Sequence, residues 1–342
     1  MNKRKHDPYN FPEYLQRNPV RRIWRVIYPA LLFILIQVAV TVIFSMIAYA
    51  VFTVQAMLSS GIPNLTDYRD IILTILTATE KAAKFLAKYS MRMVMITDIA
   101  VLAVFIPMWF KTRRYRPTAV KNAAPARPIA LTALLVPGIS LVLSIIIGLL
   151  GMNEISETFQ QVMEMITGTS FVLQVVAVAI IGPIAEELIF RGVILNRALS
   201  WMPRWSAVVL SSALFGVIHM NIPQGVFAFC IGMICGWSYV RFRSLWVPVA
   251  AHISINLTST IINRMSQSVD ANDPMTVFPV TILMIAVFAL SAVLIYPWLK
   301  TKNASIVYPD PDPVSVPAMP SPAFAETHKS QEFVWRIAED DE

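Results

Sequence analysis

The chain has 342 residues, of which 56% are hydrophobic and only 14% are charged. So few polar residues cannot cover the surface of a water-soluble globular protein, and the composition therefore excludes an ordinary soluble protein. The formal charge of +7 would suggest nucleic-acid binding in a soluble chain, but here the lysines and arginines flank apolar runs. We therefore predict a membrane protein whose surroundings are the lipid bilayer, with no nucleic-acid partner.

A helix needs about 20 apolar residues to cross the hydrocarbon core of a bilayer, and several runs approach that length. They predict an all-α fold, a polytopic transmembrane helical bundle of about eight spans. The first run has no small-residue cleavage site after it, so we expect it to be retained. The expected spans cover residues 28–54, 91–110, 129–150, 171–195, 205–220, 224–240, 245–262 and 276–299.

Basic residues gather before the first expected span and after the second. By the positive-inside rule these segments are cytoplasmic, which places both termini in the cytosol and suits a bacterial plasma membrane. One loop disagrees, because residues 55–90 would be external yet carry Arg69, Lys81, Lys84 and Lys88. The helix-prone stretch 71–89 is therefore expected to be an interfacial helix or an extension of the second span.

Composition divides the chain into five expected parts, with no internal repeat of the kind typical of inverted-repeat transporters. Cys230 and Cys235 lie within one apolar run and are interpreted as small packing residues. The tail is rich in proline and ends in acidic residues, so we expect it to be disordered. The parts are a basic cytoplasmic arm (1–27), N-terminal transmembrane helices with an interfacial segment (28–168), a catalytic core (169–264), a last transmembrane helix (265–299) and the tail (300–342).

Ionisable side chains inside a membrane are costly, so those within the apolar runs are the candidates for function. Two of the four histidines of the chain lie in such runs, and the other two lie in the polar terminal segments. The candidates come from three expected spans that follow one another closely in the sequence. They are Glu186, Glu187 and Arg191 in the fourth span, His219 in the fifth, and His252 and Asn256 in the seventh.

Helical spacing suggests a role for each candidate. Glu187 and Arg191 are four residues apart, so they share a helix face and can form the ion pair that a low-dielectric interior requires. Glu186 is turned about 100 degrees away, which leaves its carboxylate free for chemistry. His252 and Asn256 are also four apart and can point together into one cavity.

A carboxylate and two imidazoles are sufficient for hydrolysis of a peptide bond by water, in either of two ways. Glu186, His219 and His252 can bind a divalent metal such as zinc with an open position for water. Alternatively, Glu186 acts directly as the general base, while His252 and Asn256 donate hydrogen bonds to the oxyanion. The sequence leaves both versions open.

The same residues form three motifs in a fixed order. Residues 186–191 match E-E-x-x-x-R, residues 215–219 match F-x-x-x-H, and residues 252–256 match H-x-x-x-N. In this order they resemble the CPBP family of intramembrane proteases, which unites CAAX prenyl endopeptidases with bacteriocin-processing and self-immunity proteins of the Abi group. The resemblance covers about residues 171–262. It implies an α-helical membrane fold, a CAAX-type endopeptidase or metalloprotease activity, and Glu186 as a catalytic residue.

Other interpretations of the polar cluster stay open. The Glu187–Arg191 pair can serve only to lock helices, and His219 alone is more typical of a packing histidine. Asp98 has no motif partner and is assigned to packing or a polar cavity. The rivals to a protease that cuts a membrane-associated protein or peptide are a non-catalytic scaffold or immunity protein and a proton-coupled transporter. Neither the substrate nor the oligomeric state follows from the sequence.

Overall fold

The computed structural model describes residues 19–60, 67–113, 126–270 and 272–301, and every regular element within these ranges is helical. The expected all-α fold is therefore confirmed. The expected disordered tail and most of the basic arm lie outside the described residues. α2 begins at Pro19, so the last residues of the segment expected as an arm are helical.

The long helices of the N-terminal part are followed by shorter ones that build the core. Their bounds are α2 (Pro19–Ser60), α3 (Tyr68–Arg113), α4 (Ala126–Leu149), α5 (Glu157–Thr167), α6 (Phe171–Gln174), η1 (Val175–Ile181), α7 (Gly182–Glu187), η2 (Leu188–Leu195), α8 (Asn196–Ala198), α9 (Arg204–Val217), α10 (Ile222–Phe242), α11 (Trp246–Ser266) and α12 (Pro274–Lys300).

Each of the eight expected spans falls on one of these helices or runs of helices. By length and composition, six of them are able to cross a membrane among the described residues: α2, α3, α4, the continuous run 171–198, α10 and α12. α9 is apolar but shorter. The exposed side chains of α12 are largely apolar, as in Ile282, Ile285 and Phe288. Such a surface requires lipid around it, so the chain is an integral membrane protein.

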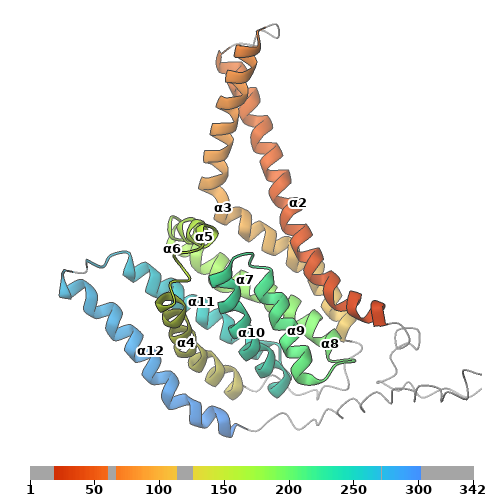
Figure 1. Cartoon of the computed structure of the whole chain (residues 1–342), viewed down its shortest axis with the longest axis vertical. Coiled ribbons are helices and arrows are strands. Elements are labelled where there is room, and N and C mark those ends of the chain that lie inside the picture. Colours follow the sequence, from red (N-terminus) through yellow and green to blue (C-terminus); the bar gives the residue numbers. More distant parts are fainter. Residues whose placement is uncertain (1–18, 61–66, 114–125, 271, 302–342) are drawn as a thin grey trace, which may run out of the picture. The chain divides into compact units, whose positions relative to one another are not determined.

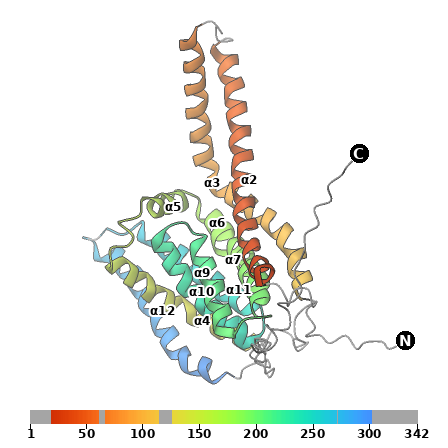
Figure 2. The same ribbon diagram turned by 45° about the vertical axis from the view of Figure 1, so that its right-hand side comes forward.

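α2 and α3 run side by side as an antiparallel pair (Figures 1 and 2). α3 is continuous from Tyr68 to Arg113, so the stretch 71–89 is an extension of the second expected span and not a separate interfacial helix. The loop expected at 151–170 contains a further helix, α5, whose N-terminus is capped by the Ser156 side chain on Phe159 N–H. No side chain of α5 is buried.

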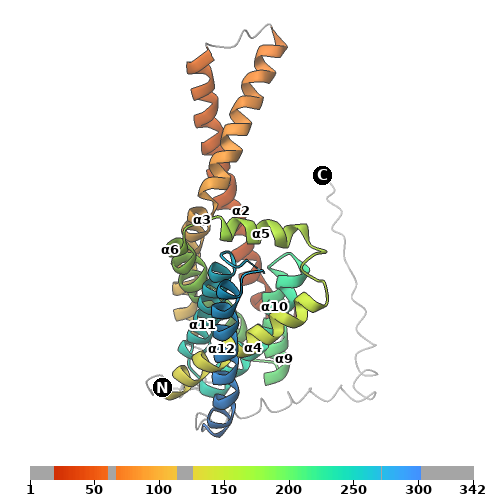
Figure 3. The same cartoon turned by 90° about the vertical axis from the view of Figure 1, so that its left-hand side faces the viewer.

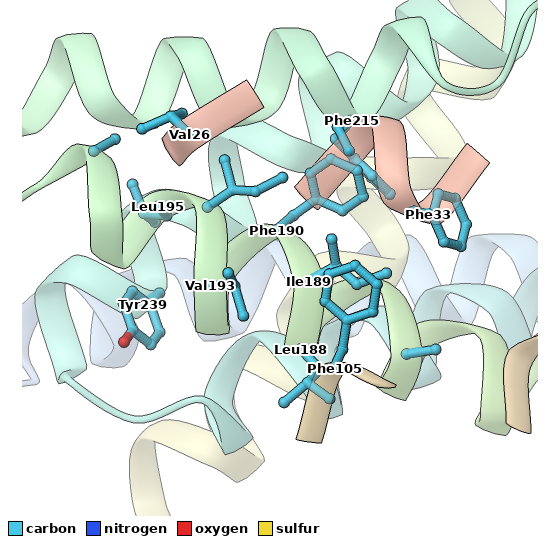
Figure 4. Packing of buried hydrophobic residues seen from close by; sticks show 14 of the residues in the cluster. Val26, Phe33, Phe105, Leu188, Ile189, Phe190, Val193, Leu195, Phe215 and Tyr239 are labelled. Atoms are coloured by element: carbon cyan, nitrogen blue, oxygen red, sulfur yellow. The ribbon is translucent and has the colours of Figure 1, made fainter. Parts of the chain in front are cut away.

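The largest apolar core joins α2 and α3 to the run 171–198 and to α9 and α10. Figure 4 shows the aromatic rings of Phe33, Phe105, Phe190 and Phe215 together with Ile189 in this cluster. All of these side chains are almost completely buried. The helix that carries the glutamate pair is thus packed on more than one side, which holds its polar residues in a defined position.

α4, α11 and α12 pack together next to this core (Figure 3). Ser291 of α12 inserts its hydroxyl into the main chain of α4, where Oγ accepts from Gly138 N–H at 3.0 Å and donates to Leu134 O at 3.3 Å. Pro137 lies at this point of α4, and a proline inside a helix breaks the regular hydrogen-bond ladder. The serine bridges the opening and ties the two helices together.

The fourth expected span departs from a uniform α-helix. It contains two π-helical segments, η1 and η2, with the α-helical turn of α7 between them. Glu186 and Glu187 are the last two residues of α7. π-helical turns are rare and occur often at functional sites. The π-helical segments on both sides of the glutamates therefore mark this region as a candidate functional site.

Candidate active site

A buried ion pair forms the base of the site. Arg191 Nη1 donates to Glu187 Oε1 at 2.8 Å, and both side chains have no exposed surface. The second terminal nitrogen of Arg191, Nη2, donates to the carbonyl of Gly232 in α10 at 3.1 Å. The pairing expected from the four-residue spacing is present, although Arg191 itself lies in the π-helical segment η2.

The imidazole of His252 lies between the two glutamates. Its Nδ1 is 3.0 Å from Glu187 Oε1, and its Nε2 is 3.6 Å from Glu186 Oε2. The Glu186 side chain is 23% exposed, whereas that of Glu187 is fully buried. Glu186 is therefore the carboxylate of the pair that a water molecule or a substrate can reach, in agreement with the helical-wheel expectation.

Phe215, the aromatic residue of the second motif, is a packing centre for the site. Its ring meets the rings of His219 and His252 edge to face, with centroids 5.1 and 5.8 Å apart. The Arg191 guanidinium lies 4.8 Å from the centroid of the same ring. A cation over an aromatic face is electrostatically favourable, so Phe215 contributes to holding Arg191 as well as both histidines.

His219 is placed differently from the helical expectation. α9 ends at Val217, so His219 lies in the turn that follows the helix. Its Nδ1 is 2.8 Å from Phe215 O, and Asn221 Nδ2 donates to His219 O at 2.9 Å. These contacts orient the ring from its own segment of the chain. They leave Nε2 as the nitrogen available for chemistry.

Asn256 and His252 share α11 but contact different groups. His252 faces the two glutamates, whereas Asn256 Nδ2 donates to the carbonyl of Val178 in η1 at 2.8 Å. That both side chains donate hydrogen bonds to one oxyanion stays a prediction. One of the two N–H groups of the amide is engaged with the main chain of the helix that leads to the glutamates.

Two contributions to the site escaped the sequence argument. Asp98 of α3 is 93% buried, lies beside Gly182 of α7, and interacts electrostatically with Glu186. An acidic residue within an apolar run was the only indication of Asp98 in the sequence. Its electrostatic partner, Glu186, lies on a helix distant in the sequence. The second is the carbonyl of Gly232, which binds Arg191. Every residue has a main-chain carbonyl, so the residue type at position 232 does not indicate this acceptor. The glycine itself permits close approach of α9 and α10.

Among the described residues, no three His, Cys, Asp or Glu side chains gather in a group that could hold a metal ion. This includes the expected set of Glu186, His219 and His252. The two cysteines are free, with Cys235 buried and Cys230 partly so, in keeping with a packing role.

Comparisons with known proteins agree with the geometry. Residues 168–258 match the family model described as type II CAAX prenyl endopeptidase Rce1-like. The chain is also 29% identical over 106 residues to "Putative membrane peptidase YdiL" of Bacillus subtilis (strain 168), a match that covers 31% of this chain and 43% of that protein. The chain thus spans less than half the length of that curated relative. No solved structure matches the chain.

The matched segment contains every residue of the glutamate–arginine–histidine cluster, so the part of the chain that is similar to membrane peptidases is the part that carries the candidate site. This similarity agrees with the resemblance to the CPBP family of intramembrane proteases that the three motifs predicted.

Proposed function

We propose that the protein is an intramembrane endopeptidase that hydrolyses a peptide bond of a membrane-associated protein or peptide. The observation that carries this proposal is the position of His252 between Glu186 and Glu187, at 3.6 and 3.0 Å. A carboxylate that anchors one ring nitrogen sets the tautomer and orientation of an imidazole. Glu187 thereby directs Nε2 of His252 toward Glu186.

In the proposed mechanism Glu186 removes a proton from water as the water attacks the scissile carbonyl. Its partial exposure gives access to water and substrate. His252, polarised by Glu187, stabilises the charge that develops beside Glu186. Arg191 neutralises Glu187, and in this proposal Nε2 of His219, in the turn after α9, is assigned to the substrate or the attacking water.

The substrate class is part of the proposal and is supported by the family comparison alone. The matched family model carries the description of a CAAX prenyl endopeptidase, so a C-terminal peptide carrying a lipid is the first substrate to test. A bacterial plasma membrane with both termini in the cytosol is the proposed location, in accord with an even number of spans.

The decisive experiment compares the membrane proteome of cells that carry the wild-type protein with that of cells that carry Glu186→Gln. The amide keeps the size of the side chain but cannot accept a proton, so fragments that depend on the protease disappear. A general base contributes about 10²- to 10⁴-fold to a rate, so the loss is expected in this range. Identical fragments in both strains, with equal amounts of folded protein, would remove the basis of the proposal.

The metal-dependent version of the mechanism is tested separately. Because the expected ligands form no metal-binding group among the described residues, the steps above pass through no metal. We expect cleavage by the purified protein to persist after dialysis against a chelator. Loss of cleavage that returns on addition of zinc would instead support Glu186, His219 and His252 as metal ligands.

A further inference from the structure

Asn256 contacts a carbonyl for which the surrounding helix offers no regular donor. Pro183 has no N–H, and its ring crowds the carbonyl four residues earlier in an α-helix. The helix widens just before this proline, over η1, and Gly182 N–H bonds to Ala177 O, five residues back. The proline thus accounts for the π-helical segment that precedes the glutamates.

This widening removes both candidate main-chain partners of Val178 O. An α-helix would offer Gly182 N–H, which is already bonded to Ala177 O. A π-helix would offer the residue five positions on, which is Pro183 and lacks a donor. Asn256 Nδ2 donates to Val178 O at 2.8 Å and supplies the hydrogen bond that these two residues cannot. A carbonyl left unpaired away from water is costly, so this bond matters for the local structure.

We propose that Asn256 is a positioning residue, which holds η1 in its π-helical form and thereby sets the position of Glu186 one helical turn beyond Gly182. This inference rests on the proposed protease function for its catalytic consequence. It assigns Asn256 a role in the enzyme before any substrate is bound, besides the oxyanion contact expected from its motif. Packing of α11 against both η1 and α7 is consistent with this role.

The inference is tested by restoring the missing donor. Asn256→Ala leaves Val178 O unpaired, and Pro183→Ala gives residue 183 an N–H that can bond to the main chain. We expect the amides of residues 175–188 to exchange with deuterium roughly five- to 150-fold faster in Asn256→Ala, which corresponds to the usual cost of an unpaired buried group. The double variant Pro183→Ala/Asn256→Ala should recover most of this protection, whereas any part of the cleavage rate that depends on an oxyanion contact of Asn256 stays lost.

Ser254→Ala is the matched control, because the hydroxyl of Ser254 bonds to Ala251 O within the same helix α11. It should leave both exchange and cleavage close to wild type. Asn256→Leu, which keeps nearly the same side-chain volume but has no hydrogen-bond donor, is a second variant if the alanine variant folds poorly.

Wild-type exchange over residues 175–188 in both Asn256 variants would overturn the inference. So would a double variant that is no better protected than Asn256→Ala. Exchange is measured without substrate, so a wild-type protein that cleaves nothing would count against the proposed function and leave the exchange result to decide this inference.

Discussion

His252 Nδ1 lies 3.0 Å from Glu187 Oε1, and the same oxygen accepts a hydrogen bond from Arg191 Nη1 at 2.8 Å. A single carboxylate oxygen therefore joins the imidazole of α11 to the guanidinium of η2. Since Glu187 and Arg191 are fully buried, the orientation of the histidine depends on an ion pair that water does not reach. Variants of His252 are therefore expected to affect mainly catalysis, whereas variants that break the Glu187–Arg191 pair are expected to affect folding as well.

His252→Gln should abolish most of the cleavage while retaining the fold. The glutamine amide can reach one carboxylate, but it cannot bridge Glu186 and Glu187 through two ring nitrogens and cannot carry a proton. We expect a loss of about 100-fold or more, as for removal of a catalytic acid–base or oxyanion group. A cleavage assay on purified protein measures the loss, and the thermal midpoint in detergent serves as the control for folding. Retention of more than half of the wild-type rate would contradict the role given to the ring.

Arg191→Leu should lower the free energy of unfolding far more than the double variant Glu187→Leu/Arg191→Leu, which removes both charges of the pair. Loss of the guanidinium leaves Glu187 buried without its counter-charge, at a cost of about 3–5 kcal/mol. Replacing both residues, as in Glu187→Leu/Arg191→Leu, should recover much of the unfolding free energy, because an apolar pair can fill a buried space. The double variant should nevertheless stay inactive, since His252 loses its anchor. Denaturant unfolding and the cleavage assay, applied to the same preparations, test both statements.

Gly216→Ala should separate α9 from α10 and reduce both stability and cleavage. A methyl group at this position would lie 2.7 Å from the main-chain oxygen of Gly225, which cannot rotate away. We expect a cost of about 1–3 kcal/mol, typical of overpacking, and a displacement of the neighbouring Phe215 ring. Gly148→Ala is the matched control, because its methyl group meets only an ordinary contact at 3.8 Å. In Gly148→Ala, alanine has a higher helix propensity than glycine, so the thermal midpoint should be unchanged or slightly higher.

Ser291→Ala should weaken the contact between α4 and α12 with little direct effect on catalysis. The hydroxyl serves both Gly138 N–H and Leu134 O, and its removal leaves these groups of α4 without that bridge. The expected cost is about 1–3 kcal/mol. Thermal unfolding in detergent measures it, and the cleavage rate below the transition should stay near wild type. An unchanged midpoint would show that the serine bridge contributes nothing to stability.

Much of the molecule follows from local properties of the sequence. Long apolar runs require helices in a bilayer because each main-chain polar group must be paired within its own segment. For the same reason the eight expected spans fall on observed helices. The pairing of Glu187 with Arg191 was also predictable, since residues four apart meet on one helix face. The order of the three motifs indicated the family, which the comparison of residues 168–258 supports.

The tertiary structure decided the features that join helices distant in the sequence. No local pattern indicates that His252 meets Glu187, that Asp98 lies beside α7, or that Asn256 serves Val178. These contacts depend on how α3 and α11 pack against the glutamate-bearing run, and packing is set by the shapes of all the side chains in between. Even the π-helical widening before Pro183 needs a donor from another helix to be complete. The sequence by itself thus determined a helical membrane protein and its candidate site residues, whereas the mutual positions of these residues required the packed structure.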